Sequence, residues 1–405
     1  MDKQTKKLLY VDYVTLIACL LYGFKTLDTQ SVTYFSDVLI DNLKFSTNQY
    51  TSLTSLYYLA YGLSSIILGL LIGKTHVRKV WLVPTMLLIG ISSIFISTVD
   101  SYMGLVICRL ISGLAGGCSL SLLLSIIAKN LVKEDYGTRS GVINAISAFI
   151  GNVLGPLFFA WMTHYYSWNS AFLISGFSLI FLSILTQFSI KEVQYPIMEK
   201  QNHGRALTES IHIMFTNKVF VLCLILGILE TAANLSQGVF IPLYFSDIIG
   251  MDTVSKGWAL SLKGFAFIPV CFIIPLLSDR FSIKTLLVAT FVFAFIAPFS
   301  AYILKGTKIS VYLLIIFGSW AEITVTLFAY VIPRLVLPEY LHAEANGIIL
   351  GSAIVFGGCI APVILSSLID IGYSVVTVLG ICSLLMFICI FISALIPLHS
   401  RNSRK

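Results

Sequence analysis

Long apolar stretches make up most of the chain, and short polar segments separate them. Each stretch is about 20 residues long, the length at which an α-helix crosses a bilayer core of roughly 30 Å. The first stretch is longer than a signal-peptide core, lacks a small-residue cleavage site and contains Lys25 and Asp28, so we expect it to be retained. The pattern predicts twelve membrane-spanning helices, over residues 10–32, 49–72, 80–98, 102–128, 141–164, 168–190, 219–243, 256–277, 283–304, 309–332, 346–369 and 373–397.

A second pattern is a repeat of residues at an offset of 206 positions. Gly141 recurs as Gly347, and Pro156 recurs as Pro362. A duplicated unit accounts for this register, and two six-helix halves are the arrangement of many secondary transporters. We therefore expect an N-terminal half over 1–190, a cytoplasmic linker over 191–218 and a C-terminal half over 219–405 that ends in a short cytoplasmic tail.

The composition is typical of a membrane protein. The chain is 57% hydrophobic and 11% charged, against roughly 25% charged residues in soluble proteins. With the N-terminus inside, nineteen lysines and arginines fall in inside segments and four in outside segments. The positive-inside rule then places both termini in the cytoplasm, in a multi-pass protein of the cell inner membrane. The same bias accounts for the net charge of +7, so we expect no nucleic-acid partner.

The sequence lacks the motifs that several other classes of protein require. No GxxxxGK[ST] phosphate loop indicates a primary pump. The eight cysteines lie in predicted spans without CxxC spacing or histidine partners, which indicates packing rather than metal or redox chemistry. No span holds a metal-ligand pair or a Ser/His dyad. We therefore expect no enzyme activity, no metal site and no cofactor.

The segment 69–79, Gly-Leu-Leu-Ile-Gly-Lys-Thr-His-Val-Arg-Lys, resembles the loop between helices 2 and 3 of the major facilitator superfamily. The family pattern there is G-x-L-x-D-R-x-G-R-R. A second copy at 275–284 keeps the acid and the base, whereas the first copy has Gly73 where the family has Asp. The resemblance implies a part in the conformational switch for Gly69, Lys74, Arg78, Asp279, Arg280 and Lys284.

Two glycine patterns extend this resemblance. Arg109 is followed by Gly113 and Gly117, which is similar to the fourth helix of the family, and Gly151-x-x-x-Gly155-Pro156 is similar to the fifth. Small residues spaced by four allow helices to approach closely, and proline allows a helix to bend. The resemblance implies an all-α membrane protein of twelve transmembrane helices in two pseudo-symmetric six-helix halves.

Charged residues inside predicted spans are the main functional candidates, because each costs several kcal/mol to insert and is retained mainly where it faces a cavity or a partner. Lys25 and Asp28 stand three residues apart, on one face of the first helix. The alternative for any of these charges is an ion pair that only locks packing, or a side chain that reaches an interface. The set is Lys25, Asp28, Arg109, Glu230, Lys263 and Glu322.

The resemblance gives some of these charges roles. Asp28 is similar both to the helix-1 acid that carries a proton in anion:cation symporters and to an acid of drug:proton antiporters. Arg109 matches the arginine that binds a substrate carboxylate in the symporters, but Gly116 stands where those proteins have a coupling Glu. The 206-residue offset pairs Gly116 with Glu322. We hypothesise that the missing carboxylate is replaced by Glu322, and expect proton coupling through Asp28, Glu230 and Glu322.

We therefore predict a secondary transporter that works as a monomer by alternating access, with its site near the middle of the bilayer between the halves. Three buried cations favour proton-coupled transport of a small organic anion. The alternatives are a proton antiporter that exports drugs or a metabolite such as a siderophore, and a membrane receptor without transport. The residues expected to bind substrate are Lys25, Arg109, Tyr57, Tyr58, Tyr61, Asn234, Gln237 and Lys263.

Overall fold

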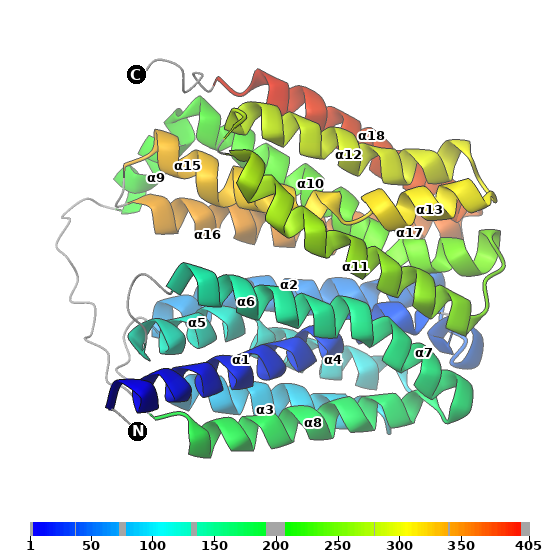
Figure 1. The fold of residues 1–405 in the computed structure, drawn as a ribbon. Helices are drawn as coiled ribbons and strands as arrows, with labels where there is room; N and C mark the ends of the chain where they lie inside the picture. The colour runs from blue at the N-terminus through cyan, green and yellow to red at the C-terminus, as the bar shows by residue number, and fades with distance from the viewer. Residues whose placement is uncertain are drawn as a thin grey trace. The chain divides into compact units, whose positions relative to one another are not determined.

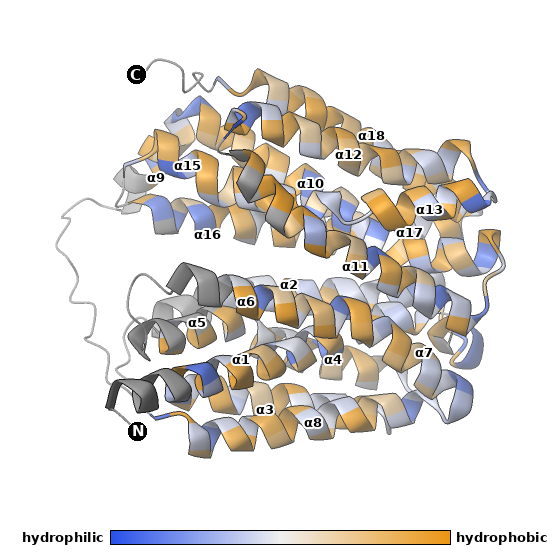
Figure 2. Ribbon diagram, viewed as in Figure 1, coloured by the Kyte–Doolittle hydropathy of each residue, from blue (hydrophilic) through white to orange (hydrophobic). Residues whose placement is uncertain are grey.

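The computed structural model describes residues 3–36, 38–72, 78–130, 136–191, 207–278, 280–338 and 341–397. Within these ranges the regular elements are all helices (Figure 1). Hydrophobic residues cover most of their length, and hydrophilic residues gather mainly toward the helix ends (Figure 2). Nine helices in the described part of the chain are long and apolar enough to cross a membrane. The all-α membrane architecture expected from the hydropathy pattern is confirmed.

The helices form two compact units. The first unit comprises Met1–Leu43 and Leu59–Gln201, and the second comprises Lys44–Tyr58 and Asn202–Lys405. Helix α2 is shared, because its first part groups with the second unit. Asn48 Nδ2 there donates to Ser367 Oγ at 3.1 Å. The unit boundary thus falls inside a predicted span and not only in a loop.

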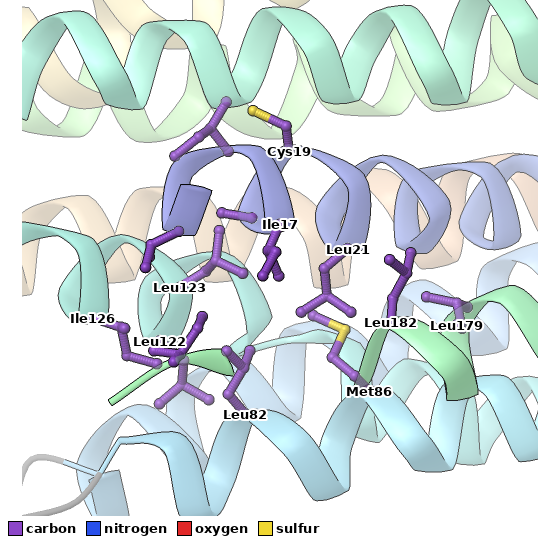
Figure 3. Packing of buried hydrophobic residues seen from close by; sticks show 14 of the residues in the cluster. Ile17, Cys19, Leu21, Leu82, Met86, Leu122, Leu123, Ile126, Leu179 and Leu182 are labelled. Atoms are coloured by element: carbon purple, nitrogen blue, oxygen red, sulfur yellow. The ribbon is translucent and has the colours of Figure 1, made fainter. Parts of the chain in front are cut away.

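The first unit packs its helices around a core of apolar side chains. Helix α3 lies against α4 and α8, and α1 lies against α6, η3 and α8. Leu21 of α1, Met86 of α3 and Leu182 of α8 belong to this core (Figure 3). Its elements are α1 (Lys3–Tyr34), η1 (Val38–Asn42), the second part of α2 (Thr47–Ile72), α3 (Lys79–Ile96), α4 (Tyr102–Gly116), α5 (Ser119–Asn130), α6 (Tyr136–Ala148), η3 (Phe149–Leu154), α7 (Gly155–Tyr165) and α8 (Trp168–Ser189).

The second unit repeats this packing. Helix α12 lies against α18 as α3 lies against α8, and α10 lies against η7 as α1 lies against η3. Helix α9 falls within the predicted linker 191–218, and its Met214 is buried. The elements are α9 (Leu207–Thr216), α10 (Lys218–Leu243), η4 (Tyr244–Ile248), α11 (Thr253–Ser278), α12 (Ile283–Ile303), α13 (Lys308–Phe317), α14 (Trp320–Val325), η5 (Thr326–Val331), α15 (Ile332–Val336), α16 (His342–Ser352), η7 (Ala353–Ile360), α17 (Ala361–Asp370) and α18 (Val375–Leu395).

The 206-residue register of the sequence is also a register of backbone conformation. Helix α2 at 47–72 corresponds to α11 at 253–278, and the π-helical segment η1 at 38–42 corresponds to η4 at 244–248. Helix starts repeat too: Ser101 caps α4 and Thr307 caps α13, each by accepting a backbone N–H three residues on. The internal repeat predicted from residue identities is therefore present in the fold.

The predicted span 102–128 is not one continuous helix, because α4 ends at Gly116 and α5 begins at Ser119. Helix α2 approaches this break closely. A Cβ added at Gly117 would lie 2.8 Å from Ser65 N, and the Ser65 hydroxyl donates to the Gly117 carbonyl at 2.8 Å. Glycine is needed here for the close helix contact, which agrees with the small-residue spacing in the sequence.

Candidate functional site

Three charged side chains of the first unit are buried together. Lys25 and Asp28 lie on α1, Arg109 lies on α4, and each is less than 5% exposed. The Arg109 guanidinium donates from Nη1 to the Asp28 carbonyl at 3.3 Å and from Nη2 to the Thr29 carbonyl at 3.0 Å. Arg109 thus ties α4 to the main chain of α1 at the turn that carries Asp28.

The Asp28 carboxylate has no hydrogen-bond partner on either oxygen, although its residue is 1% exposed. The charges of Arg109 and Lys25 act on it from a distance. Ser93 of α3 lies nearby, but its hydroxyl hydrogen-bonds with Ser175 Oγ at 3.0 Å and donates to the Phe172 carbonyl at 3.3 Å. An ionised carboxylate buried without hydrogen bonds is costly, so this group is suited to the gain and loss of a proton.

The Lys25 ammonium lies over two aromatic rings. Its Nζ is 4.8 Å from the centroid of the Tyr61 ring and 5.4 Å from that of Tyr22. A cation this close to ring faces is stabilised by the ring quadrupoles. The aromatic rings offset part of the cost of burying the lysine's charge. Tyr61 was expected to bind substrate, whereas Tyr22 was not, although its spacing of three residues from Lys25 places both on one helix face.

The second unit also buries a carboxylate. Glu230 of α10 is 1% exposed, and its Oε2 accepts a hydrogen bond from Thr231 Oγ1 at 3.0 Å. Its other oxygen, Oε1, has no hydrogen-bond partner. Asn234, one turn further along α10, lies beside the same carboxylate. Gln237 is also buried and donates through Nε2 to the Ala233 carbonyl at 3.2 Å.

Lys263 and Glu322 form a second acid and lysine combination in this unit. Both side chains are half-buried, and the charge of each acts on the other. Gly318 makes room for the lysine, since a Cβ added there would lie 2.8 Å from Lys263 Cε. The Ser319 hydroxyl donates to the Lys263 carbonyl at 3.3 Å. The charge of Glu322 also acts on Glu230, so the three predicted charges of the second unit form one cluster.

Close backbone contacts hold the turns that carry the two buried carboxylates. A Cβ added at Gly151 of η3 would lie 3.2 Å from the main-chain nitrogen of Leu27, the residue before Asp28. A Cβ added at Gly357 of η7 would lie 2.8 Å from the main-chain nitrogen of Ala232, two residues after Glu230. These two glycines are 206 residues apart, so the contact itself is duplicated.

The remaining predicted residues are not all brought together. Tyr57 and Tyr58 contact each other with ring centroids 5.4 Å apart, but they belong to the part of α2 that groups with the second unit. Lys256 is one of the four lysines that the predicted topology places in outside segments. It is 1% exposed, with its Nζ 3.5 Å from Ser246 Oγ. Its burial could not be read from hydropathy because it lies at the end of a span.

The structure describes only some residues of the two predicted switch loops. Lys74 and Asp279 lie outside the described residues. Gly69 lies in α2, and Arg78 directly precedes α3. Of the second copy, Arg280 follows α11 and Lys284 lies in the first turn of α12. A role for these positions in the conformational switch stays a prediction.

Comparison with known proteins gives a match over most of the chain. A family model described as Major Facilitator Superfamily matches residues 16–362. The uncharacterized protein Cj0987c of Campylobacter jejuni is 29% identical over 141 residues, which is 31% of this chain and 43% of that protein. The chain therefore covers less than half the length of this curated relative.

Solved transporter structures share the fold. A bacterial homolog of the human lysosomal transporter Spinster, inward-facing and unoccupied, has a TM-score of 0.75 at 12% identity, covering 96% of this chain and 97% of that one. The nucleoside transporter NupG has a TM-score of 0.77 at 17% identity, covering 96% and 100%. A POT family transporter in complex with 5-aminolevulinic acid has a TM-score of 0.74 at 13% identity, covering 97% and 96%.

Proposed function

The chain belongs to the Major Facilitator Superfamily, and we propose that it moves a small organic anion across the membrane together with protons. Membership makes it a multi-pass membrane transporter of a small molecule and not an enzyme. The proton coupling and the anionic substrate are our inference from the buried charges. Alternating access in such proteins requires that substrate and coupling ion bias the same conformational equilibrium.

The observation that carries the proposal is the Asp28 carboxylate, which is 1% exposed and has no hydrogen bond, on the same face of α1 as Lys25. When Asp28 is ionised, its charge offsets that of Lys25. When Asp28 takes a proton, the positive charge of Lys25 is no longer balanced by Asp28 and can hold an anion. Proton and anion then bind best together, which is the thermodynamic requirement for symport.

Lys25 is the better candidate for direct contact with the anion, and Arg109 is better suited to positioning. Two guanidinium nitrogens of Arg109 already donate to α1 carbonyls. Before Arg109 can bind a carboxylate through two parallel hydrogen bonds, its hydrogen bonds to the α1 carbonyls have to break. Lys25, by contrast, contacts the faces of two tyrosine rings, and a ligand can stack on such rings.

The second unit offers an equivalent pair. Glu322 lies at the register position of Gly116, and its charge acts on Lys263 as that of Asp28 acts on Lys25. We propose that Glu322 is the second proton-coupling carboxylate. The charge distribution along the sequence further supports an inner-membrane orientation with both termini in the cytoplasm.

The test is uptake of a labelled carboxylate library into proteoliposomes with an imposed pH gradient, inside alkaline. Wild-type protein should accumulate at least one carboxylate only when the gradient is present. Lys25→Gln should lose this uptake, while Lys305→Gln, at an exposed position, should keep it. Gradient-independent uptake of every transported compound, or full uptake by Lys25→Gln, would contradict the proposal.

A further inference from the structure

The Ser93 hydroxyl lies between two helices that both offer it a hydrogen-bond acceptor. Ser93 is on α3, which packs against α1 and α8, and its side chain is fully buried. On the α8 side, Ser93 Oγ is 3.0 Å from Ser175 Oγ and donates to the Phe172 carbonyl at 3.3 Å. On the α1 side, Ser93 lies beside the Asp28 carboxylate. Two sets of acceptors therefore compete for one hydroxyl proton.

The Ser93 hydroxyl can turn away from α8 without leaving the Phe172 carbonyl unpaired. The Ser175 hydroxyl also donates to that carbonyl, at 3.1 Å. Each serine hydroxyl has a single proton, so the three contacts among these groups share two protons. Asp28, in contrast, is 1% exposed and has no hydrogen bond on either carboxylate oxygen. Its ionised form therefore needs a donor more than the Phe172 carbonyl does.

We propose that Ser93 donates a hydrogen bond to Asp28 when that carboxylate is ionised, and turns back to α8 when Asp28 takes a proton. Only the torsion of the Ser93 hydroxyl changes. Ser93 keeps its own proton, and the proton that Asp28 releases passes to water. Protonation of Asp28 is thereby linked to the hydrogen bonds between α3 and α8. The inference rests on the proposed function, because it requires Asp28 to gain and lose a proton.

The charged groups around Asp28 do not supply this hydrogen bond. Lys25 Nζ lies over two tyrosine rings, and the Arg109 guanidinium donates to main-chain carbonyls of α1. Both charges act on the Asp28 carboxylate without a hydrogen bond to it. The other helices that pack on α1 carry charged or histidine residues only at helix ends or with side chains outside the described part, namely Lys79, Lys129, Arg139 and His164.

Removal of the Ser93 hydroxyl should raise the pH at which Asp28 loses its proton. A hydrogen bond to an ionised acceptor is about twice as strong as one between neutral groups, so Ser93→Ala destabilises mainly the ionised state of Asp28. The expected shift of the midpoint is about one pH unit. Ser175→Ala should act in the opposite sense, by roughly a few tenths of a pH unit, because Ser93 then loses a partner on α8 and donates to Asp28 more readily.

The test is infrared spectroscopy of purified full-length protein in lipid membranes, titrated with acid and base. A protonated carboxyl group has a carbonyl stretching band that an ionised carboxylate lacks, and the part of this band that Asp28→Asn removes belongs to Asp28. Ser93→Ala should give a midpoint above that of wild type, and Ser175→Ala a midpoint below it. Ser93→Thr keeps a hydroxyl and should restore the wild-type value. Ser93→Cys, whose thiol is a weaker donor, should give an intermediate value and serves as a second variant if alanine prevents folding.

Ser92→Ala is the matched control. Ser92 precedes Ser93 on α3, is also buried, and donates to the Cys108 carbonyl at 2.6 Å, so its loss should leave the Asp28 midpoint unchanged. An unchanged midpoint in Ser93→Ala, or an equal shift in Ser92→Ala, overturns the inference while a titrating Asp28 still supports the proposed function. An upward shift in Ser175→Ala also overturns the inference, because α8 then does not compete for the hydroxyl. The absence of any band that depends on Asp28 overturns both the inference and the proposed coupling through Asp28.

Discussion

Asp28→Asn should uncouple substrate movement from the proton gradient and leave substrate exchange intact. The asparagine side chain has nearly the size of the protonated acid, so packing on α1 is preserved. The asparagine carries no charge at any pH. No carboxylate at position 28 then balances the positive charge of Lys25 on the same face of α1. The variant imitates the state in which the transporter is ready to bind an anion.

The size of the effect follows from the spacing of the two residues on α1. Side chains three residues apart have Cβ atoms about 5–6 Å apart, so an anion at Lys25 lies on the order of 7 Å from the Asp28 carboxylate. At an effective dielectric constant of about 20, like charges at that distance repel by roughly 2.4 kcal/mol. This corresponds to about a fifty-fold change in anion affinity between the ionised and protonated states.

The assay has two parts. Substrate binding to detergent-solubilised protein should weaken about fifty-fold with rising pH in the wild type and stay nearly constant in Asp28→Asn. In proteoliposomes, the variant should exchange labelled for unlabelled substrate and fail to accumulate it against a gradient. Asp100→Asn is the control, because Asp100 is an exposed acid just before α4. Wild-type accumulation by Asp28→Asn would refute the reasoning and leave Asp28 as a structural neighbour of Lys25.

Three further outcomes are expected. Arg109→Lys should lower the thermal stability in detergent, because a single lysine nitrogen cannot reproduce the spread of the two guanidinium nitrogens that bond two α1 carbonyls; an unchanged melting temperature would show that these two hydrogen bonds add no stability. Gly357→Ala should impair folding or transport, since its Cβ meets main-chain atoms of α10, whereas Gly347→Ala has nothing within 4 Å and should be neutral or stabilising by roughly 0.5–1 kcal/mol; equal behaviour in a melting assay would refute this. Hydrogen bonds from Ser255 hold the pKa of Asp252 below its ordinary 3.8, so the cap it gives α11 adds stability at neutral pH that is lost as pH falls through the lowered pKa. The difference in melting temperature between wild type and Asp252→Ala should therefore shrink below about pH 4, and a constant difference would show that charge plays no part.

The sequence alone determined the helical architecture and the internal repeat. Hydropathy is a local property that each apolar stretch carries by itself, so spans such as 168–190 and 283–304 coincide with α8 and α12 within a few residues. The offset of 206 residues predicted the duplication, and the structure extends it to features that the sequence did not indicate, including the matching π-helical segments η1 and η4. The six charges inside spans were identified because the insertion cost of a charge depends on its residue type and depth.

Only the tertiary structure decided which partner each charge has. Arg109 was predicted to bind substrate, which stays a prediction, and the packing of α4 on α1 directs its guanidinium to two main-chain carbonyls that the sequence did not indicate. Glu230 and Asp28 were assigned the same role from sequence, yet cations act on Asp28 and another acid acts on Glu230. The physical reason is that hydrogen bonds and charge pairs join helices far apart in the chain. The rotation of each helix about its axis, which sets these contacts, follows from the packing of all its neighbours at once.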